Sequence, residues 1–303
     1  MKLVFSNENE PIASADREEI PEGKVLTDAQ VAAYTRDGIQ FPIDVMSPAE
    51  AAALRTRYEA AERAHGGRMP PRINQKPHLL YPWLAELVRH PRILDAVEDV
   101  IGPDILCWSA GFFAKNAHDP SYVSWHQDGT YWGLSTPDVI TAWFALTPST
   151  LANGCMQVVP GTQRAQVEHV DTFAESNLLS RGQEIQVEVR PEEKVAVELR
   201  AGQMSLHHVL IFHGSDANES DDRRIGFAIR YIPTHVRQIN GPRESATLVR
   251  GEDRYGHFDL EPAPEAEMHP DAVARHAAIV DRQLAILYAG AARPGKLGAT
   301  IGR

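Results

Sequence analysis

Apolar positions follow two different spacings along the chain and divide it into a helical part and a strand-rich part. Between residues 25 and 103 they recur at helical spacing, in segments that open with capping signals. Thr27 with Gln30 and Ser47 with Glu50 each have the pattern of a capping box. Helices are therefore predicted from Thr27 to a stop at Gly38, from Ser47 to about Gly66-Gly67, over Trp83 to Val88 and over Pro91 to Ile101.

From Ile105 to about residue 234 the spacing changes to short apolar or alternating runs separated by Gly, Pro, Asn and Asp. This pattern is typical of a β-sandwich or a β-barrel. Asn153-Gly154 lies between two of the runs and predicts a tight hairpin. Strands are predicted over Ile105 to Lys115, Tyr122 to Gln127, Val139 to Leu146, Cys155 to Val159, Val195 to Leu199, Gln203 to His207 and Arg224 to Tyr231.

Beyond Tyr231 the chain is rich in arginine and has no clear period until a final amphipathic helix. Arg243, Arg250 and Arg254 lie in this segment. We interpret it either as a lid that contacts an anionic group of a substrate or as a solvated loop outside the strand core. The final helix, Asp271 to Tyr288, is expected to pack on the domain or to form the face of a homodimer.

Length and composition indicate one domain with helical additions. The chain has 303 residues, 43% of them hydrophobic, which is enough to bury a sizeable core. The expected organisation is an extended lead-in at 1–24, a helical flanking region at 25–103, a strand core at 104–234, and a C-terminal loop and helix at 235–303 in the same domain. A loop at 68–80 is interpreted either as a segment that approaches an active site or as a plain surface connection.

Charge and cysteine content exclude several classes of protein. The net charge of −11 offers no basic footprint for nucleic acid or an anionic membrane. No apolar span is long enough to cross a bilayer, and the N-terminus turns acidic early, so a cytoplasmic protein is expected. Cys107 and Cys155 are too few for a disulfide scaffold, and both lie in apolar runs where buried free thiols are expected.

Two short segments have the composition of a metal site. His126 and Asp128 are two residues apart, so on an extended strand both side chains project from one face. His213, 87 residues after His126, would complete two imidazoles and one carboxylate. This facial set leaves metal positions open at non-haem Fe(II). The spacing alone is weak in a chain with 13 histidines, but Ser215 and Arg224 follow His213 at short range and add context.

The pattern of His126-x-Asp128, then His213-Gly214-Ser215, then Arg224 eleven residues after His213 resembles the phytanoyl-CoA dioxygenase family of Fe(II)/2-oxoglutarate oxygenases. The resemblance implies a mainly β fold with flanking helices, a double-stranded β-helix of the jelly-roll, cupin-like barrel type. It implies that His126, Asp128 and His213 hold Fe(II). It also implies that Arg224 and Ser215 bind the far carboxylate of 2-oxoglutarate, with dioxygen as the second cosubstrate.

Neighbouring residues have plainer interpretations. Relatives commonly show a histidine where Gln163 stands here, and we expect this departure to affect only a surface turn. His207 and His208 are interpreted as satisfied polar residues of a strand, one of which can still line the cavity. Arg223 is expected in a surface ion pair, which places Arg224 on the opposite face of its strand.

The substrate pocket is assigned from residues near the predicted ligands. Trp132, Trp143 and Gln157 are the candidates, and Lys115 and Asn116 are weaker ones. The two tryptophans are interpreted either as a shield around the substrate or as core residues. No cluster for the phosphates of coenzyme A is evident, so a small-molecule substrate is expected rather than an acyl-CoA.

The resemblance implies hydroxylation of an aliphatic C–H bond in a small metabolite or natural-product intermediate, with release of succinate and CO2. Related halogenases have a small residue in place of the carboxylate, so Asp128 favours hydroxylation over chlorination. Desaturation, ring closure and epimerisation use the same ligands and stay open. The alternatives are a metal-dependent hydrolase or cupin-like isomerase with Zn(II) or Mn(II), which leaves Arg224 and Ser215 unexplained, and a non-catalytic binding barrel.

Overall fold

The computed structural model describes residues 25–292, so the predicted lead-in at 1–24 and the last residues of the C-terminal region, 293–303, lie outside it. Its helices are α1 (Asp28–Asp37), α2 (Pro48–Ala64), α3 (Pro82–Leu87), α4 (Pro91–Ile101) and α5 (Pro270–Leu287). Its strands are β1 (Ile39–Asp44), β2 (Ile105–Lys115), β3 (Val123–His126), β4 (Ile140–Ala145), β5 (Gln157–Val159), β6 (His169–Asp171), β7 (Gln183–Ile185), β8 (Val195–Ala196), β9 (Gln203–His208), β10 (Phe212–Ser215), β11 (Arg224–Pro233), β12 (Ser245–Arg250) and β13 (Asp259–Leu260).

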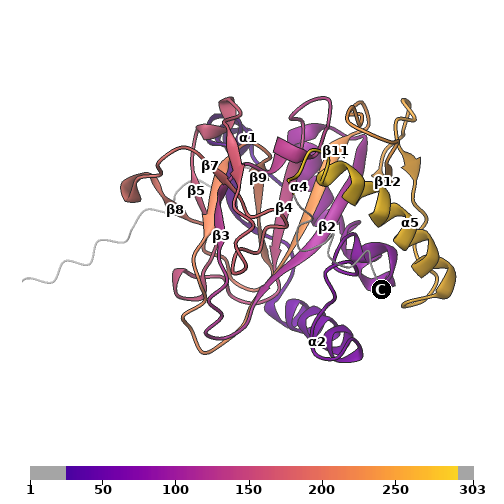
Figure 1. Cartoon of the computed structure of the whole chain (residues 1–303), viewed down its shortest axis with the longest axis horizontal. Coiled ribbons are helices and arrows are strands. Elements are labelled where there is room, and N and C mark those ends of the chain that lie inside the picture. The colour runs from indigo at the N-terminus through magenta and orange to yellow at the C-terminus, as the bar shows by residue number, and fades with distance from the viewer. Residues whose placement is uncertain (1–24, 293–303) are drawn as a thin grey trace, which may run out of the picture.

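Two sheets form the framework of the fold (Figure 1). The larger has the strand order β1-β9-β4-β11-β2-β12-β13, and the smaller has the order β3-β10-β5-β8. Neighbouring strands are antiparallel except β12 and β13, which are parallel. In Figure 1 the smaller sheet stands on one side of the molecule, and β12 and α5 lie at the other. The predicted fold, mainly β with flanking helices and of the jelly-roll type, is confirmed.

The large sheet is buried on both faces, which explains the continuous apolar run of β4. Ala142 and Phe144 belong to the cluster that packs against α2, α3 and α4, whereas Trp143 and Ala145 belong to the cluster between the two sheets. Successive side chains of a strand point to opposite faces, so one strand serves both layers. The inward face of the large sheet is therefore available to build a site against the smaller one.

Local capping chemistry sets the helix boundaries where the sequence predicted them. The Thr27 hydroxyl accepts from the backbone N–H of Gln30 at 3.2 Å, and the Gln30 side chain accepts from the backbone N–H of Thr27 at 2.8 Å. Ser47 and Glu50 form the second capping box. Gly38 ends α1 in the left-handed region, with φ of 77°. These caps are confirmed.

The prediction that Gln163 lies on a surface turn is wrong. Its side chain is buried, and its Nε2 donates to the backbone oxygens of Thr35 and Arg36 at 3.2 Å each. A Cβ on Gly38 would lie 2.7 Å from the same side chain. Gln163 therefore binds the carbonyl groups at the end of α1, where a helix leaves acceptors unsatisfied.

Asn153-Gly154 forms a turn but not the predicted hairpin. Gly154 does adopt the left-handed conformation, with φ of 70°, at the end of a short 3-10 turn that Thr150 and Asn153 cap. However, β4 and β5 on either side belong to different sheets. The local turn signal was correct, but the turn carries the chain from one sheet to the other.

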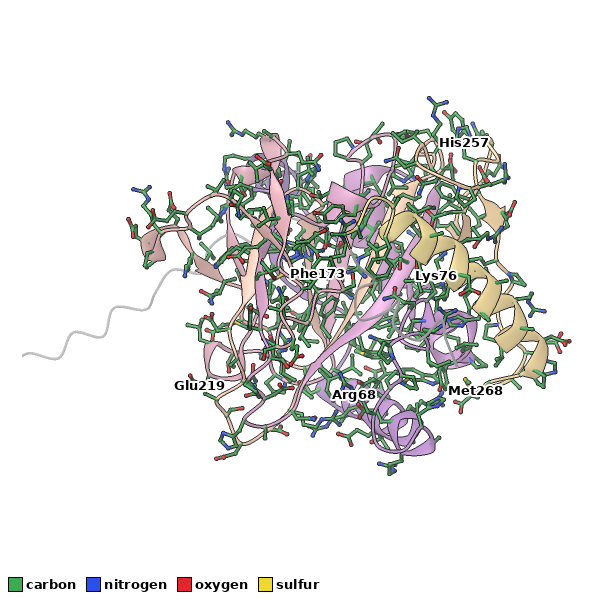
Figure 2. All side chains as sticks on the ribbon, in the orientation of Figure 1. Arg68, Lys76, Phe173, Glu219, His257 and Met268 are labelled. Atoms are coloured by element: carbon green, nitrogen blue, oxygen red, sulfur yellow. The ribbon has the colours of Figure 1, made fainter. Side chains whose placement is uncertain are left out.

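A buried polar network fixes the segment before α3 to the C-terminal part of the chain. Lys76 Nζ donates to Glu261 Oε1 and to the backbone oxygen of Ser245, both at 2.6 Å. Glu261 Oε2 also accepts from the Thr247 hydroxyl at 2.7 Å. Figure 2 labels Lys76 near the middle of the molecule, and both charged side chains are 1% exposed. Of the helices in residues 25–292, none has the length and apolar character to cross a membrane.

Candidate metal centre

The candidate centre lies where β3 pairs with β10. His126 and His213 are direct cross-strand partners, both buried, with ring centroids 4.0 Å apart. Asp128 follows the end of β3 and opens a 3-10 turn, which its backbone N–H anchors to the Val209 oxygen at 2.9 Å. The potential ligand atoms of these three side chains lie within 4.8 Å of one another. The structure thus brings the three predicted ligands together.

Hydrogen bonds select the tautomer of both histidines. His126 Nδ1 lies 2.9 Å from the Ser124 oxygen, and His213 Nδ1 lies 3.0 Å from the Ile211 oxygen. A carbonyl oxygen only accepts, so each Nδ1 carries the proton. The Nε2 atoms of both rings are left to face Asp128, at 3.3 Å and 4.0 Å from its Oδ1. Orientation of a ligand histidine through its second nitrogen is typical of metal sites.

Electrostatics keep the centre in the protonation state that a metal ion needs. Burial lowers the pKa of His213 well below its ordinary value, and neighbouring His126 lowers it further. Burial alone would raise the pKa of Asp128, but the adjacent His126 imidazole and the charge of Arg230 outweigh it and hold that pKa well below its usual range. A neutral imidazole at His213 and an ionised carboxylate are therefore ready to bind a cation.

These side chains fit the metal that the sequence implied. Two imidazole nitrogens and one carboxylate on neighbouring backbone segments make up the facial set of non-haem Fe(II) oxygenases, which leaves positions for a cosubstrate and oxygen. In the part of the chain that the structure describes, this is the group of histidine and acidic side chains close enough to hold an ion.

An inner cavity of about 40 Å³ lies between the two sheets beside the three ligands. Ser215, Arg224 and Trp143, all singled out from the sequence, line it. The rest of its wall comes from Phe113, Val123, Thr141, Met156, His207, Gly214, Ala228 and Arg230.

Arg224 is fully buried and has spare hydrogen-bonding capacity toward this cavity. Its Nη1 donates to the Gly154 oxygen at 2.7 Å, and its Nε has no partner among the described residues. Lys115, its direct partner across β2 and β11, is also buried and donates from Nζ to the Ser215 hydroxyl at 2.8 Å. Two buried cations with an orphaned donor fit a bound carboxylate, as the sequence implied for 2-oxoglutarate.

Lys115 was only a weak candidate in the sequence because its role depends on pairing between distant strands. Burial, and next the charge of Arg224, lower its pKa to about 7. Burial also lowers the pKa of Arg224 to about 10. The pairing of residues 115 and 224 has no local signal in the sequence.

His207 differs from the sequence interpretation. It is buried and lines the inner cavity, and its Nδ1 has no hydrogen-bond partner in the described chain, so it is not a satisfied strand residue. Its ring centroid lies 5.1 Å from that of His213, and burial lowers its pKa to about 4. His208 does fit the interpretation, because its Nδ1 accepts from the Leu210 N–H at 3.1 Å.

An outer cavity of about 480 Å³ adjoins the inner one. Phe113, Asp128 and Arg230 line both cavities and mark their junction. The predicted loop at 68–80 does approach the site, through residues such as Arg68 and Asn74. The C-terminal helix α5 adds Gln283, Ile286 and Leu287, so it forms one wall of the outer cavity.

The three candidate pocket residues occupy different places. Trp143 lines the inner cavity and Trp132 lines the outer one. Gln157 lines neither, and its Nε2 donates to Asp216 Oδ2 at 2.6 Å beneath the site.

The lid interpretation of the C-terminal arginines is wrong. Arg243, Arg250 and Arg254 line neither cavity. Each is paired with acids outside the site: Arg243 with Asp259, Arg250 with Asp95 and Glu98, and Arg254 with Glu252. Arg223 forms the predicted ion pair, at 2.9 Å from Glu62. The arginine that sequence reasoning missed at the site is Arg230, which alternation places on the same face of β11 as Arg224.

Comparison with known proteins agrees with this geometry. The phytanoyl-CoA dioxygenase (PhyH) family matches residues 34–226. The solved structure of ThoJ, a non-heme monooxygenase, is 35% identical with a TM-score of 0.76 and covers 86% of this chain and 98% of its own. CytC3 with Fe(II) and alpha-ketoglutarate is 27% identical with a TM-score of 0.57, covering 78% of this chain and 93% of its own.

Two curated proteins are also similar to this chain in sequence. L-proline trans-4-hydroxylase of Streptomyces griseoviridis is 28% identical over 233 residues, which cover 68% of this chain and 86% of that protein. A probable alpha-ketoglutarate-dependent hypophosphite dioxygenase of Stutzerimonas stutzeri is 29% identical over 162 residues, 52% of this chain. That match spans 55% of the dioxygenase, about half its length.

Proposed function

Because the chain belongs to the phytanoyl-CoA dioxygenase family, we propose that it is an Fe(II)/2-oxoglutarate-dependent oxygenase that hydroxylates an aliphatic C–H bond of a small molecule. One observation carries the proposal. The buried triad of His126, Asp128 and His213 shares a cavity with the buried Arg224. Its strand partner Lys115 is also buried and donates to Ser215 in the wall of that cavity, and neither cation has an acid as an ion-pair partner among the described residues.

The triad would hold the iron. His126 and His213 present their unprotonated Nε2 atoms, and Asp128 supplies the negative charge. Bound iron with 2-oxoglutarate and dioxygen supplies the oxidising chemistry, in which 2-oxoglutarate becomes succinate and CO2. The two backbone-anchored rings and the buried carboxylate hold the ligand geometry before the metal arrives, so little reorganisation is needed.

Arg224 and Ser215 would bind the distal carboxylate of 2-oxoglutarate. The planar guanidinium of Arg224 suits a carboxylate through two parallel hydrogen bonds, and its Nε is unused. The Ser215 hydroxyl accepts from Lys115 and so turns its own proton away from that lysine, toward another acceptor. A carboxylate between Arg224 and Ser215 would accept from the Arg224 Nε–H and from the Ser215 hydroxyl.

Asp128 supports hydroxylation as the outcome. A carboxylate ligand fills the coordination position that a halide would need, so the protein has no vacancy for chloride at that point. The names of two similar proteins, a proline hydroxylase and a monooxygenase, agree with transfer of oxygen to a small molecule.

The test is an anaerobic titration of the apo-protein with Fe(II) and then with 2-oxoglutarate, followed through the visible charge-transfer band of the chelate. The native protein should give the band, His213→Ala should lose it, and Arg224→Ala should need far more 2-oxoglutarate. Arg223→Ala, the neighbour on the opposite face of the strand, is the matched control and should titrate like the native protein. Iron binding without the band would reject the cosubstrate and favour a hydrolase or isomerase.

A further inference from the structure

Arg230 lies where the inner and outer cavities adjoin. With Phe113 and Asp128 it lines both of them. Its side chain is 14% exposed, and its guanidinium carbon lies 5.3 Å from the ring centroid of Trp132 and 5.9 Å from that of Phe113. Two aromatic rings therefore hold the guanidinium in place, which fixes the plane of its donors.

The donors of Arg230 are not used up by the protein. Its ion-pair partner within residues 25–292 is Asp128, whose Oδ2 lies 3.9 Å from Nε. That separation is too long for a hydrogen bond, and Nε has no other partner. Asp128 is also one of the proposed metal ligands, so a bound cation would take up its charge. A buried Nε donor without an acceptor is costly, which indicates that an external acceptor belongs there.

The other acids that line the outer cavity already have donors and do not compete for Arg230. Glu62 binds Arg223 at 2.9 Å, and Asp119 accepts from the Ser121 N–H at 2.9 Å. Glu244 Oε2 accepts from Trp108 Nε1 at 2.9 Å and from Gln238 Nε2 at 2.8 Å. The described residues therefore leave an unused donor at the junction, which an oxygen acceptor from outside them would satisfy.

The proposed cosubstrate, 2-oxoglutarate, is not expected to bind Arg230, because its distal carboxylate is assigned to Arg224. The inward positions of β11 between the two arginines are Gly226 and Ala228. Arg224 and Arg230 are six positions apart on the strand, a Cα distance of about 20 Å. The small residues between them keep the inner cavity open, and Arg230 faces the outer cavity at its far end. The two arginines thus stand at opposite ends of one strand face.

Resting on the proposed oxygenase function, we propose that the substrate is a carboxylic acid whose carboxylate binds Arg230. The planar edge of a guanidinium matches the two oxygens of a carboxylate better than a single donor does. Because Arg230 lies beside a ligand of the proposed metal, the oxidised carbon lies within a few bonds of that carboxylate. Apolar side chains of the outer cavity, namely Trp108, Trp132, Leu178, Leu179, Ile286 and Leu287, receive the rest of the molecule.

Arg68 adds positive charge to the entrance. It is exposed, lines the outer cavity and has no ion-pair partner among the described residues (Figure 2 labels it). An unpaired cation at the mouth raises the local concentration of anions. Binding of a carboxylic acid should therefore weaken with ionic strength, whereas binding of its amide should not.

The experiment uses the full chain loaded anaerobically with Fe(II) and 2-oxoglutarate, so that binding is measured without turnover. Hexanoate, phenylacetate and N-acetyl-leucine are titrated beside their primary amides, and the shift of the charge-transfer band reports occupation of the site. At least one acid should bind about 10- to 100-fold more tightly than its amide. Arg230→Met should abolish this preference while the 2-oxoglutarate band persists, and Arg230→Lys should keep part of it.

Arg243→Met, which removes an exposed arginine outside both cavities, should leave the preference unchanged. Thermal melts of all variants exclude a folding defect. If no acid binds more tightly than its amide, or if Arg230→Met keeps the preference, the substrate assignment is overturned. Absence of the band in the native protein is a different failure, since it rejects the oxygenase function itself.

Discussion

Lys115 and Arg224 are direct partners across the β2–β11 ladder, and both are buried. Like charges so close together, away from water, destabilise each other unless an anion lies between them. Burial and next the charge of Arg224 lower the pKa of Lys115 to about 7, and burial lowers the pKa of Arg224 to about 10. The free protein therefore holds its cosubstrate site in an electrostatically unfavourable state, which a bound dicarboxylate relieves.

This relationship predicts that affinity for 2-oxoglutarate depends on pH. Besides Arg224, the charged or titratable groups that act on Lys115 are Asp216, Asp119 and Cys155. Lys115 is protonated below its pKa of about 7, and an anion favours that form. Affinity should be highest below pH 7 and fall as pH rises, by up to about tenfold per unit, because binding takes up a proton. Anaerobic titrations from pH 6.5 to 9 measure it.

Lys115→Met is the control for this pH dependence. The variant should bind 2-oxoglutarate more weakly than the native protein at pH 6.5 and should show a flat pH profile. Calorimetry in buffers of different ionisation enthalpy should detect proton uptake only in the native protein. An equally steep profile in Lys115→Met would assign the titration to another group.

Replacement of Asp128 by alanine should remove both iron retention and hydroxylation. The variant keeps two imidazoles but loses the charged ligand, so its affinity for Fe(II) should fall by at least about 100-fold, since even the residues that orient metal ligands contribute 10- to 100-fold. Iron content after dialysis and succinate release measure the two effects. A variant that retains native iron content would show that Asp128 is not a ligand.

Gly226→Ala should damage the cosubstrate site through Trp143. A Cβ at this position would lie 1.9 Å from the indole ring, so the ring must move into or out of the inner cavity. We expect 2-oxoglutarate affinity to drop about tenfold or more, with some loss of stability from overpacking. Adding Trp143→Phe, which shortens the ring, should restore part of the affinity. No change in the single variant would mean that Trp143 does not shape the site.

Glu261→Gln should destabilise the fold without touching the site. It leaves Lys76 buried without its counter-charge, which costs about 3–5 kcal/mol in the free energy of unfolding. Urea denaturation measures this cost. Glu252→Gln, which breaks an exposed pair with Arg254, should change the same quantity by less than about 1 kcal/mol. Comparable effects of the two substitutions would contradict a structural role for the buried pair.

The same pair predicts loss of stability in acid. Burial would raise the pKa of Glu261, but Lys76 and His78 outweigh it and hold the pKa at about 2. A carboxyl with a lowered pKa in the folded state stabilises that state above its unfolded pKa of about 4.3. This contribution should disappear as pH falls from about 4.3 toward 2, and Glu261→Gln should not show the loss.

The sequence predicted the elements whose signals are local. Thr27 and Ser47 mark helix starts because a cap involves residues only three apart. Strand β2 appears as a long apolar run because both of its faces are buried. The short strand β10 was recognised as a motif rather than as a strand, because four residues that include His213 and Gly214 carry no apolar pattern.

The site could be predicted only as far as its motif reaches. His126, Asp128 and His213 stand in a recognisable pattern, and the structure brings them together. The role of Lys115 depends on the pairing of β2 with β11, and the role of Arg230 depends on which side chains form the opposite wall of the cavity. Residues close to either position in the sequence give no signal of these contacts. The Asn153-Gly154 turn was misread for the same reason, since the sheet to which each strand belongs is decided by distant partners.

The two cavities are built from different parts of the chain. The wall of the inner cavity comes almost wholly from strands of the two sheets, whose side chains are held by packing on both faces. The wall of the outer cavity also includes residues of the loop after α2 and of the C-terminal helix. Substitutions at the cavity-lining positions of those outer segments are therefore expected to change the outer wall and to leave the metal ligands in place. A saturation library confined to residues 67–75 and 283–287 would therefore be the place to select for new substrate preferences while the metal site keeps its residues.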